Sequence, residues 1–327
     1  MISIEKYNHK MLNVWDDFVS NSNNGTMFNK QTFLNYHISR KFNNHSLLFY
    51  LKDKLVCVLP AITARKNKQK ILHSHPGASF GGLILNKNIP FSICNEILQA
   101  LENYCRRKRF DSIVFINTPI IYYKNRDESL NYLLLWNNFK CFENYISHYI
   151  KIGDCDNINQ LLSKRKRRYI KNLLKQNKFI IKPYKNFNSF YNILLKSKKM
   201  FFSKPTHSLK ELKKLQALFP DDIELLVSKH GQEISGGALL FYVNDVSCLI
   251  FYNVVKEQYR DSQLAALQIY ACMERAKKHG HNRIDLGVSH SPENENPLQP
   301  KTSLIEFKEQ FGAKGVLRTV YKKALND

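Results

Sequence analysis

The sequence is short of acidic residues, and this shortage dominates its composition. It contains 27 Asp and Glu against 50 Lys and Arg, which gives a formal net charge of +23 at pH 7. Such a surplus concentrates anions around the protein and speeds their capture. The positive charge is compatible with several anionic partners: nucleic acid, a nucleotide sugar, coenzyme A or an anionic membrane face. Because Lys, Asn and Ile are frequent throughout, part of this charge is also expected simply to solvate the surface.

Cysteine motifs and long apolar runs are missing as well. The seven cysteines are scattered and form no C-x-x-C pair, which argues against a zinc site and a disulfide framework. No apolar run approaches the ~20 residues that span a bilayer. Met1–Tyr7 also lacks the apolar core of a signal peptide. We therefore expect no metal, reduced cysteines and a cytoplasmic location.

One pattern occurs twice in the chain. A charged turn inside an apolar hairpin lies at Phe49–Leu59 and again at Leu225–Phe241. Each hairpin is followed by another apolar strand, a helix and a short strand. The offset of roughly 175 residues is far longer than the period of about 20–50 residues found in solenoids, so it indicates domain duplication. The length also fits about two domains at roughly 150 residues each.

The order of these elements predicts the fold class. Consecutive hairpins with interleaved helices are typical of an α+β fold with mixed sheets, and not of a doubly wound parallel sheet. We expect two tandem domains, 1–153 and 154–327. Two packed copies of one unit are expected to form a cleft between them, and ligands commonly bind in such clefts.

A dense basic run, Lys164–Arg168, lies near the start of the second domain. It belongs to an expected linker helix, 157–178, whose apolar residues gather on one face. Like charges this close repel each other unless an anion lies nearby. We therefore interpret the helix as an anion-binding stripe that includes Arg167 and Arg168. The alternative is a solvated helix that joins two domains.

The start of the helix Ser262–His279 is a second candidate anion site. The free N–H groups at a helix N-terminus suit a phosphate or pyrophosphate. Arg260 would add a charged contact and the Ser262 hydroxyl a neutral one. Alternatively, Ser262 caps the helix and Arg260 lies on the surface.

The element order, the duplication and two C-terminal stretches, Arg283–Gly287 and Leu304–Gly312, resemble the tandem GNAT-fold acyltransferases. These are the FemAB-type aminoacyltransferases and the related N-acetyltransferases of cell-envelope and polysaccharide clusters. The Phe-Lys-x-x-Phe-Gly piece at 307–312 and the basic helix are the most specific matches. The resemblance implies two GNAT-like domains, with the acceptor held by the first and the donor and active site in the second.

The resemblance also implies a donor and the residues that hold it. GNAT enzymes bind acetyl-CoA or another acyl-CoA through a loop of the form Gln/Arg-x-x-Gly-x-Gly/Ala. Arg260 and Ala265 match its first and last positions, whereas Gln263 replaces the glycine that permits close backbone approach. Ser262 and Tyr252 complete the expected donor site. FemAB-type enzymes use aminoacyl-tRNA in place of a thioester and lack a working loop.

The catalytic residues are expected near the C-terminal motif. The resemblance implies that Lys308 stabilises the negative charge that develops during acyl transfer, which is the chemistry an oxyanion requires. Asp285 and His290 are candidate general bases within reach of that site. Alternatively, Lys308 is a surface lysine and Asp285 hydrogen-bonds a loop. His73 and His75, which precede the glycine-rich segment of the first domain, are expected to line the acceptor side.

These observations lead to one expected function and two rivals. We expect an acyl-CoA-dependent N-acyltransferase that modifies an amine on an anionic nucleotide-linked or lipid-linked sugar precursor of the cell envelope. The first rival is an aminoacyl-tRNA-dependent transferase of the FemAB type, which would make tRNA a partner. The second is a non-catalytic module on a degenerate GNAT fold that binds nucleic acid or an anionic membrane.

Overall fold

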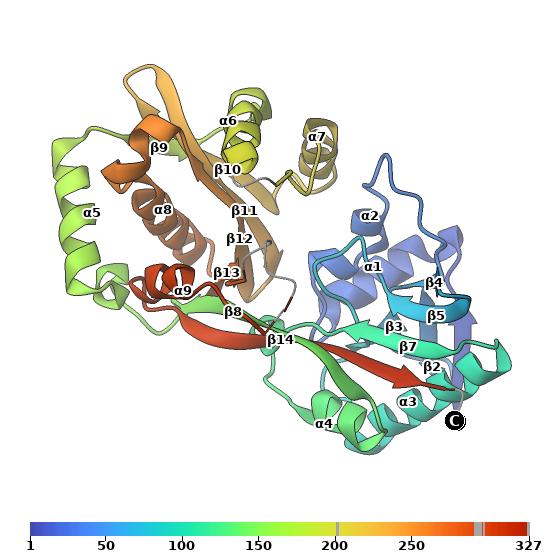
Figure 1. Ribbon diagram of the computed structural model, residues 1–327. Coiled ribbons are helices and arrows are strands. Elements are labelled where there is room, and N and C mark those ends of the chain that lie inside the picture. The colour runs from blue at the N-terminus through green and yellow to red at the C-terminus, as the bar shows by residue number, and fades with distance from the viewer. Residues whose placement is uncertain (201–202, 291–295, 297, 326–327) are drawn as a thin grey trace. The chain divides into compact units, whose positions relative to one another are not determined.

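The computed structural model of the protein describes residues 1–200, 203–290, 296 and 298–325 (Figure 1). The chain separates into two compact units, one formed by Met1–Tyr145 with Leu317–Asp327 and the other by Ile146–Val316. The strands β8 (Lys140–Lys151) and β14 (Lys314–Ala324) each cross a unit boundary. The expected domains, 1–153 and 154–327, differ from these units mainly at the C-terminus.

The last strand groups with the first unit because of its pairing. Val320–Ala324 of β14 pair antiparallel with Ser112–Ile116 of β7. Tyr321 and Leu325 are buried in the core of that unit. The duplicated pattern in the sequence ends before this strand, so it carries no signal for the return of the chain.

The first unit contains two groups of strands. β1, β2, β3 and β6 form a four-stranded antiparallel sheet in that order, and β4, β5, β7 and β14 follow one another in a second sheet, where β5 and β7 run parallel. Its elements are β1 (Ile2–Lys6), η1 (His9–Met11), α1 (Leu12–Asn21), η2 (Met27–Asn29), α2 (Gln31–Leu34), β2 (Leu47–Leu51), β3 (Lys54–Leu59), β4 (Ala61–Lys66), β5 (Gln69–Ser74), β6 (Ile84–Leu85), α3 (Phe91–Arg107), β7 (Ser112–Ile116), η3 (Ile120–Tyr122) and α4 (Ser129–Trp136).

The long helix α3 shows why this part of the sequence folds as it does. Cys94, Ile97, Leu98, Leu101 and Cys105 recur at helical spacing and are all buried. This stripe packs into the main core of the first unit. Burying one face of an amphipathic helix in this way supplies most of its stability in a protein.

The second unit is built on strands in the order β8, β13, β12, β11, β10, β9. Neighbours are antiparallel except β12 and β13, which run parallel. Its remaining elements are η4 (Ile158–Leu161), α5 (Lys164–Gln176), β9 (Ile180–Pro183), α6 (Phe187–Met200), α7 (Leu209–Leu218), β10 (Ile223–His230), β11 (Glu233–Asn244), β12 (Ser247–Val255), η5 (Glu257–Ser262), α8 (Leu264–Lys278), β13 (Arg283–Val288) and α9 (Thr302–Glu309).

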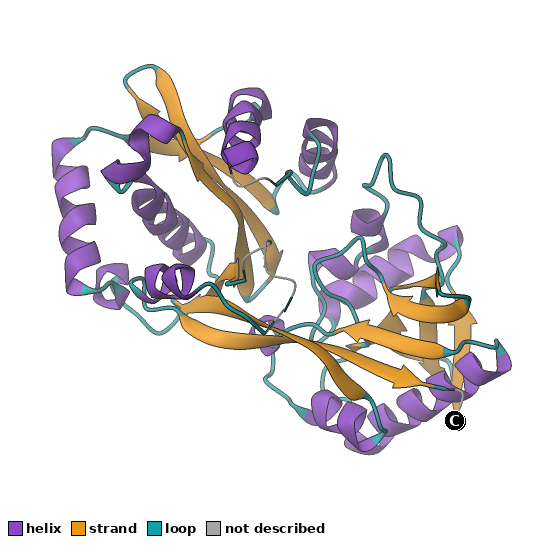
Figure 2. Ribbon diagram, viewed as in Figure 1, coloured by secondary structure: helices purple, strands orange, loops and turns teal. Residues whose placement is uncertain are grey.

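Helices α6 and α8 cover opposite faces of this sheet (Figure 2). Gly236 and Gly237 are neighbours in β11, so their Cβ directions point to opposite faces. A Cβ on Gly236 would come within 2.6 Å of Gln268 Nε2 in α8, and one on Gly237 within 2.9 Å of the Phe190 ring in α6. The two glycines therefore allow both helices to pack closely on the sheet.

The expected single helix at 157–178 is wrong in detail. The structure has the short helix η4 and then α5, separated by Leu162, which is extended, and by Ser163. Ser163 is the N-cap of α5, where its Oγ accepts a hydrogen bond from the Lys166 backbone N–H at 3.2 Å. Asn177 ends α5 in the left-handed conformation, with φ of 48°.

The predicted class is confirmed, since helices alternate with mixed parallel and antiparallel strands in an α+β arrangement. Among the described residues, no helix combines the length and the apolar character needed to cross a membrane.

Candidate active site

The parallel strands β12 and β13 separate soon after they begin. They pair only through Ser247–Leu249 and Arg283–Asp285, although β12 continues to Val255 and β13 to Val288. Within the described residues, no further pairing joins these two strands. The second half of β12 therefore has a backbone edge that β13 does not occupy.

A β-bulge in β12 lies where this separation begins. Leu239 of β11 faces Tyr252, but the next residue, Leu240, faces Ile250, so Phe251 is the extra residue. Bulges re-aim backbone groups and are frequent beside active sites. The backbone of Leu249–Tyr252 lies at this bulge.

A second bulge interrupts β13 opposite β8. Asp285 faces Tyr149 and Val288 faces Ser147, so one extra residue is accommodated between them. Gly287 allows this because its φ of 76° is left-handed and readily adopted by glycine.

The Asp285 carboxylate holds this second bulge together. Asp285 is fully buried, and its Oδ1 accepts hydrogen bonds from the Ser147 hydroxyl at 2.8 Å and the Gly287 N–H at 2.7 Å. Ser147 lies in β8 and Gly287 in β13, so these two contacts hold the strands at the bulge and do not go to a loop.

Lys308 of α9 reaches the same bulge. Its side chain is 4% exposed, so the alternative of a surface lysine is wrong. Its Nζ donates to the carbonyl oxygens of Gly287 at 2.7 Å and Val288 at 3.0 Å, and to Ser289 Oγ at 3.0 Å. A buried ammonium group is thus held at the point where β13 leaves β12.

Ser289 connects Lys308 to a histidine that sequence analysis missed. Ser289 Oγ lies 2.7 Å from Nδ1 of the buried His148. Because an ammonium group can only donate, Ser289 Oγ accepts the hydrogen bond from Lys308. Burial, and then the Lys308 charge, hold the pKa of His148 below its usual value.

The backbone keeps Ser289 in place at both ends. Its N–H donates to Ile146 O at 2.8 Å, and its carbonyl accepts from the Lys301 N–H at 2.7 Å. The half-buried His290 follows directly, and its backbone forms a bridge with Pro300. His148 lies in β8, about 140 positions from Ser289, and no local motif in the sequence connects the two.

In the predicted donor loop, Gln263 has the backbone conformation expected of the related loop, whereas Ser262 and Arg260 contact other parts of the protein. Gln263 adopts a φ of 60°, the left-handed conformation that glycine would take in the related loop. Helix α8, which follows it, has no side-chain cap at its N-terminus. Ser262 Oγ donates to the Tyr259 carbonyl of its own turn at 2.6 Å, and Arg260 Nη2 lies 3.3 Å from Met200 Sδ. Ala265 accepts a hydrogen bond from Asn253 Nδ2 at 3.1 Å.

A buried lysine from the basic helix reaches this loop. Lys166 is 4% exposed, and its Nζ donates to Gln263 Oε1 at 2.8 Å. Burial, and then the neighbouring Arg165, lower its pKa. Arg167 and Arg168 of the same run, the two residues predicted to bind an anion, are both exposed. Only one member of the run points inward because α5 packs on α8 along a single face.

Three further predicted residues lie elsewhere. The Tyr252 hydroxyl accepts hydrogen bonds from the N–H groups of Thr206 at 3.0 Å and His207 at 3.3 Å, so it anchors the loop before α7. In the first unit, His73 Nδ1 donates to Ser74 O at 2.5 Å. His75 is buried, and its Nδ1 accepts from the Gly77 N–H at 3.1 Å. Burial, with His37 as the next cause, lowers the pKa of His75 to about 3.

A family model and solved structures identify this architecture. Residues 193–295 match the model of an acetyltransferase (GNAT) domain. FemX is 13% identical to the chain, with a TM-score of 0.73 over 98% of both chains. L-PGS from Bacillus licheniformis is 12% identical, with a TM-score of 0.56 over 96% of this chain and 91% of its own.

A tandem GNAT protein from the clavulanic acid biosynthesis pathway is 8% identical, with a TM-score of 0.54 over 100% of this chain and 99% of its own. No curated protein matches the sequence. The family match and the shared fold confirm the predicted resemblance: residues 193–295 match an acetyltransferase (GNAT) domain, and the chain as a whole has the fold of the tandem GNAT proteins.

Proposed function

We propose that the chain transfers an acyl group to an amine on an anionic sugar precursor of the cell envelope. The observation that supports this most strongly is the buried Lys308 ammonium group at the bulge of β13. Attack of an amine on an acyl carbonyl places negative charge on the carbonyl oxygen. Preorganised donors in a site shielded from water stabilise that charge effectively.

Each residue of the cluster has a distinct task in this proposal. The backbone N–H groups of Leu249–Tyr252 polarise the carbonyl. Lys308 stabilises the developing oxyanion through its positive charge, since its three N–H donors bond Gly287 O, Val288 O and Ser289 Oγ. Ser289 and the neutral His148 hold the ammonium group in position through its hydrogen bond to Ser289 Oγ. Asp285 keeps the bulge in shape, and His290 is the proposed base that removes a proton from the attacking amine.

The residues before α8 suit a donor that carries phosphate groups, and we propose acyl-CoA. The uncapped N-terminus of α8 offers N–H groups to an anion, and Lys166 adds a buried cation next to Gln263. Lys166, Arg260 and this first helical turn would hold the phosphates. Such a donor supplies an activated acyl carbonyl with a thiolate leaving group.

An aminoacyl-tRNA donor is the second candidate, and the exposed face of α5 favours it. Lys164, Arg165, Arg167, Arg168 and Lys171 are basic, and all are exposed. Phosphate groups of an RNA backbone would be attracted to such a stripe, and the binding would weaken as salt rises. The same stripe would serve the non-catalytic alternative, a module that binds nucleic acid or an anionic membrane without turnover.

Calorimetric titration of the full chain with acetyl-CoA, coenzyme A and bulk tRNA at physiological salt separates these donors. Saturable micromolar binding of acetyl-CoA, weakened in Lys166→Ala, is the expected result. Binding of tRNA without binding of acetyl-CoA would overturn the thioester proposal and favour aminoacyl transfer. Binding of tRNA with no transfer from the charged form would leave the binding module.

A further inference from the structure

A cavity of about 650 Å³ lies in the second unit, away from the Lys308 cluster. It is lined by α6, the ends of β10 and β12, the start of β11, and the start of η5. None of Lys308, Ser289, His148 or Asp285 lines it. Its volume falls within the range of about 300–1,000 Å³ that is usual for small-molecule sites.

One face of α6 forms a wall of this cavity. Ser189, Asn192, Lys196 and Ser197 line it and recur at helical spacing. Phe190 and Leu194 of the same helix are buried in the unit, whereas Ile193 and Met200 line the cavity beside the polar residues. The helix is therefore anchored by its apolar residues while it presents hydroxyl, amide and ammonium groups to the cavity.

Three lysines approach the cavity from different elements. Lys196 comes from α6, Lys229 from the end of β10, and Lys256 from the residue after β12. Glu257 is the acidic residue in the lining.

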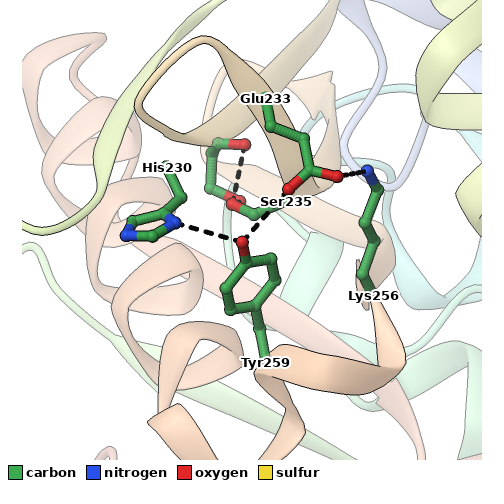
Figure 3. A network of polar contacts seen from close by, with 6 residues as sticks. His230, Glu233, Ser235, Lys256 and Tyr259 are labelled. Carbon is green, nitrogen blue, oxygen red and sulfur yellow. Dashed lines mark hydrogen bonds and ion pairs between the residues drawn. The ribbon is translucent and has the colours of Figure 1, made fainter.

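A hydrogen-bond network holds one of these lysines in place, as Figure 3 shows. Lys256 Nζ pairs with Glu233 Oε1 at 2.5 Å. The Tyr259 hydroxyl donates to Glu233 Oε2 at 3.1 Å and lies 3.1 Å from His230 Nδ1. Glu233 thus balances the charge of Lys256.

Within the part of the chain that the structure describes, the other two lysines, Lys196 and Lys229, are not paired with a carboxylate in this way. Among the described residues, neither Lys196 nor Lys229 has a hydrogen-bond acceptor or an ion-pair partner. Lys229 is half-buried and Lys196 is exposed. An anion in the cavity would supply the missing negative charge.

We propose that this cavity binds a small phosphorylated sugar. Lysine ammonium groups are well suited to a phosphate group. The Ser189, Asn192 and Gln232 side chains supply donors and acceptors for sugar hydroxyls. A free phosphate ion would fill only a small part of the volume. The site goes beyond the proposed acyl transfer, because its residues are separate from the Lys308 cluster and its binding requires no turnover.

Calorimetry with glucosamine 1-phosphate, glucosamine and inorganic phosphate tests the site. We expect saturable binding of glucosamine 1-phosphate, at least tenfold weaker binding of each of the other two probes, and lower affinity as salt rises. Lys196→Glu with Lys229→Glu should weaken binding at least tenfold. Lys199→Glu, on the same helix but outside the cavity lining, is the matched control and should leave binding unchanged.

A second variant tests the cavity by another means, in case the charge reversals impair folding. Asn192→Phe, at an exposed position of α6 that lines the cavity, should block binding by filling space without changing the charge. Unaltered binding in both the charge and the filling variants would overturn the proposal. So would a loss of acetyl-CoA affinity in the same variants, because the cavity would then belong to the acyl donor. Failure of acyl transfer with intact sugar phosphate binding would count against the proposed function alone.

Discussion

At the scale of single residues, the cluster around Lys308 combines a cation, a hydroxyl and a neutral imidazole within hydrogen-bond distance. Lys308 was predicted from the resemblance, and its burial makes it suitable for stabilising charge in a site with little water. Ser289 and His148 could not be predicted, because β8 and the end of β13 meet only in the folded chain.

The first prediction concerns the Lys308 charge. Replacing Lys308 with Met should lower the acyl-transfer rate by about 100-fold, the usual effect of losing one oxyanion donor. Lys308→Arg, which keeps the charge, should lose less. Lys314→Met, at an exposed position, is the control. Steady-state kinetics together with a thermal melt measure both effects, and a fully active, folded Lys308→Met variant would remove Lys308 from the mechanism.

The second prediction is a loss of stability at acidic pH that originates in the first unit. Burial lowers the pKa of His75 to about 3 and that of His45 to about 4, from an ordinary value of 6.5. At a pH between the folded and the unfolded pKa of each histidine, the imidazole is protonated in the unfolded chain but neutral in the folded chain. The free energy of unfolding should therefore be fully retained above pH 6.5 and fall as the pH drops toward 4.

Urea unfolding at a series of pH values measures this effect. His75→Gln should reduce the slope of stability against pH below 6.5, whereas the exposed His9→Gln should leave it unchanged. Equal slopes in the wild type and His75→Gln would show that the buried imidazole is not a source of the acid sensitivity.

At the scale of elements, the two bulges shape the site. One lies in β12 at Phe251 and the other in β13 at Gly287, and both occur where the parallel strands separate. The sequence indicated the strands by their apolar runs. The bulges could not be predicted, because an extra residue is visible only against the partner strand.

The third prediction tests the bulge of β13. Gly287 and Gly280 both have positive φ, 76° and 79°, and a Cβ at either would meet nothing within 4 Å. Alanine at each should therefore cost a similar conformational strain of about 1–2 kcal/mol. Only Gly287→Ala should also lower the acyl-transfer rate, since Lys308 binds the Gly287 carbonyl. Equal kinetics in the two variants would contradict a role for the bulge geometry in catalysis.

At the scale of the whole molecule, the chain does not divide at one point. The first unit is completed by Leu317–Asp327, so the second unit is an insertion between its parts in the sequence. The duplication predicted two α+β units, but it placed the final strand in the second.

The fourth prediction tests this closure. Tyr321 is 6% exposed in the core of the first unit, whereas Leu317 of the same strand is 61% exposed. Tyr321→Ala should lower the free energy of unfolding by about 3 kcal/mol, as is usual for a large buried side chain. Leu317→Ala should change it by less than about 0.5 kcal/mol. Limited proteolysis should show cleavage of Tyr321→Ala first within residues 1–145.

The sequence by itself determined the class of the fold, the duplication, the surplus of positive charge and the motif that contains Lys308. These properties depend on composition and on local periodicity, which are present in any stretch of the chain. Tertiary structure alone decided that Lys166 and not Arg167 points inward, and that His148 lies beside Ser289. It also decided that Lys196, Lys229 and Lys256 share one cavity. Such contacts depend on which faces of distant elements meet, and packing sets that geometry.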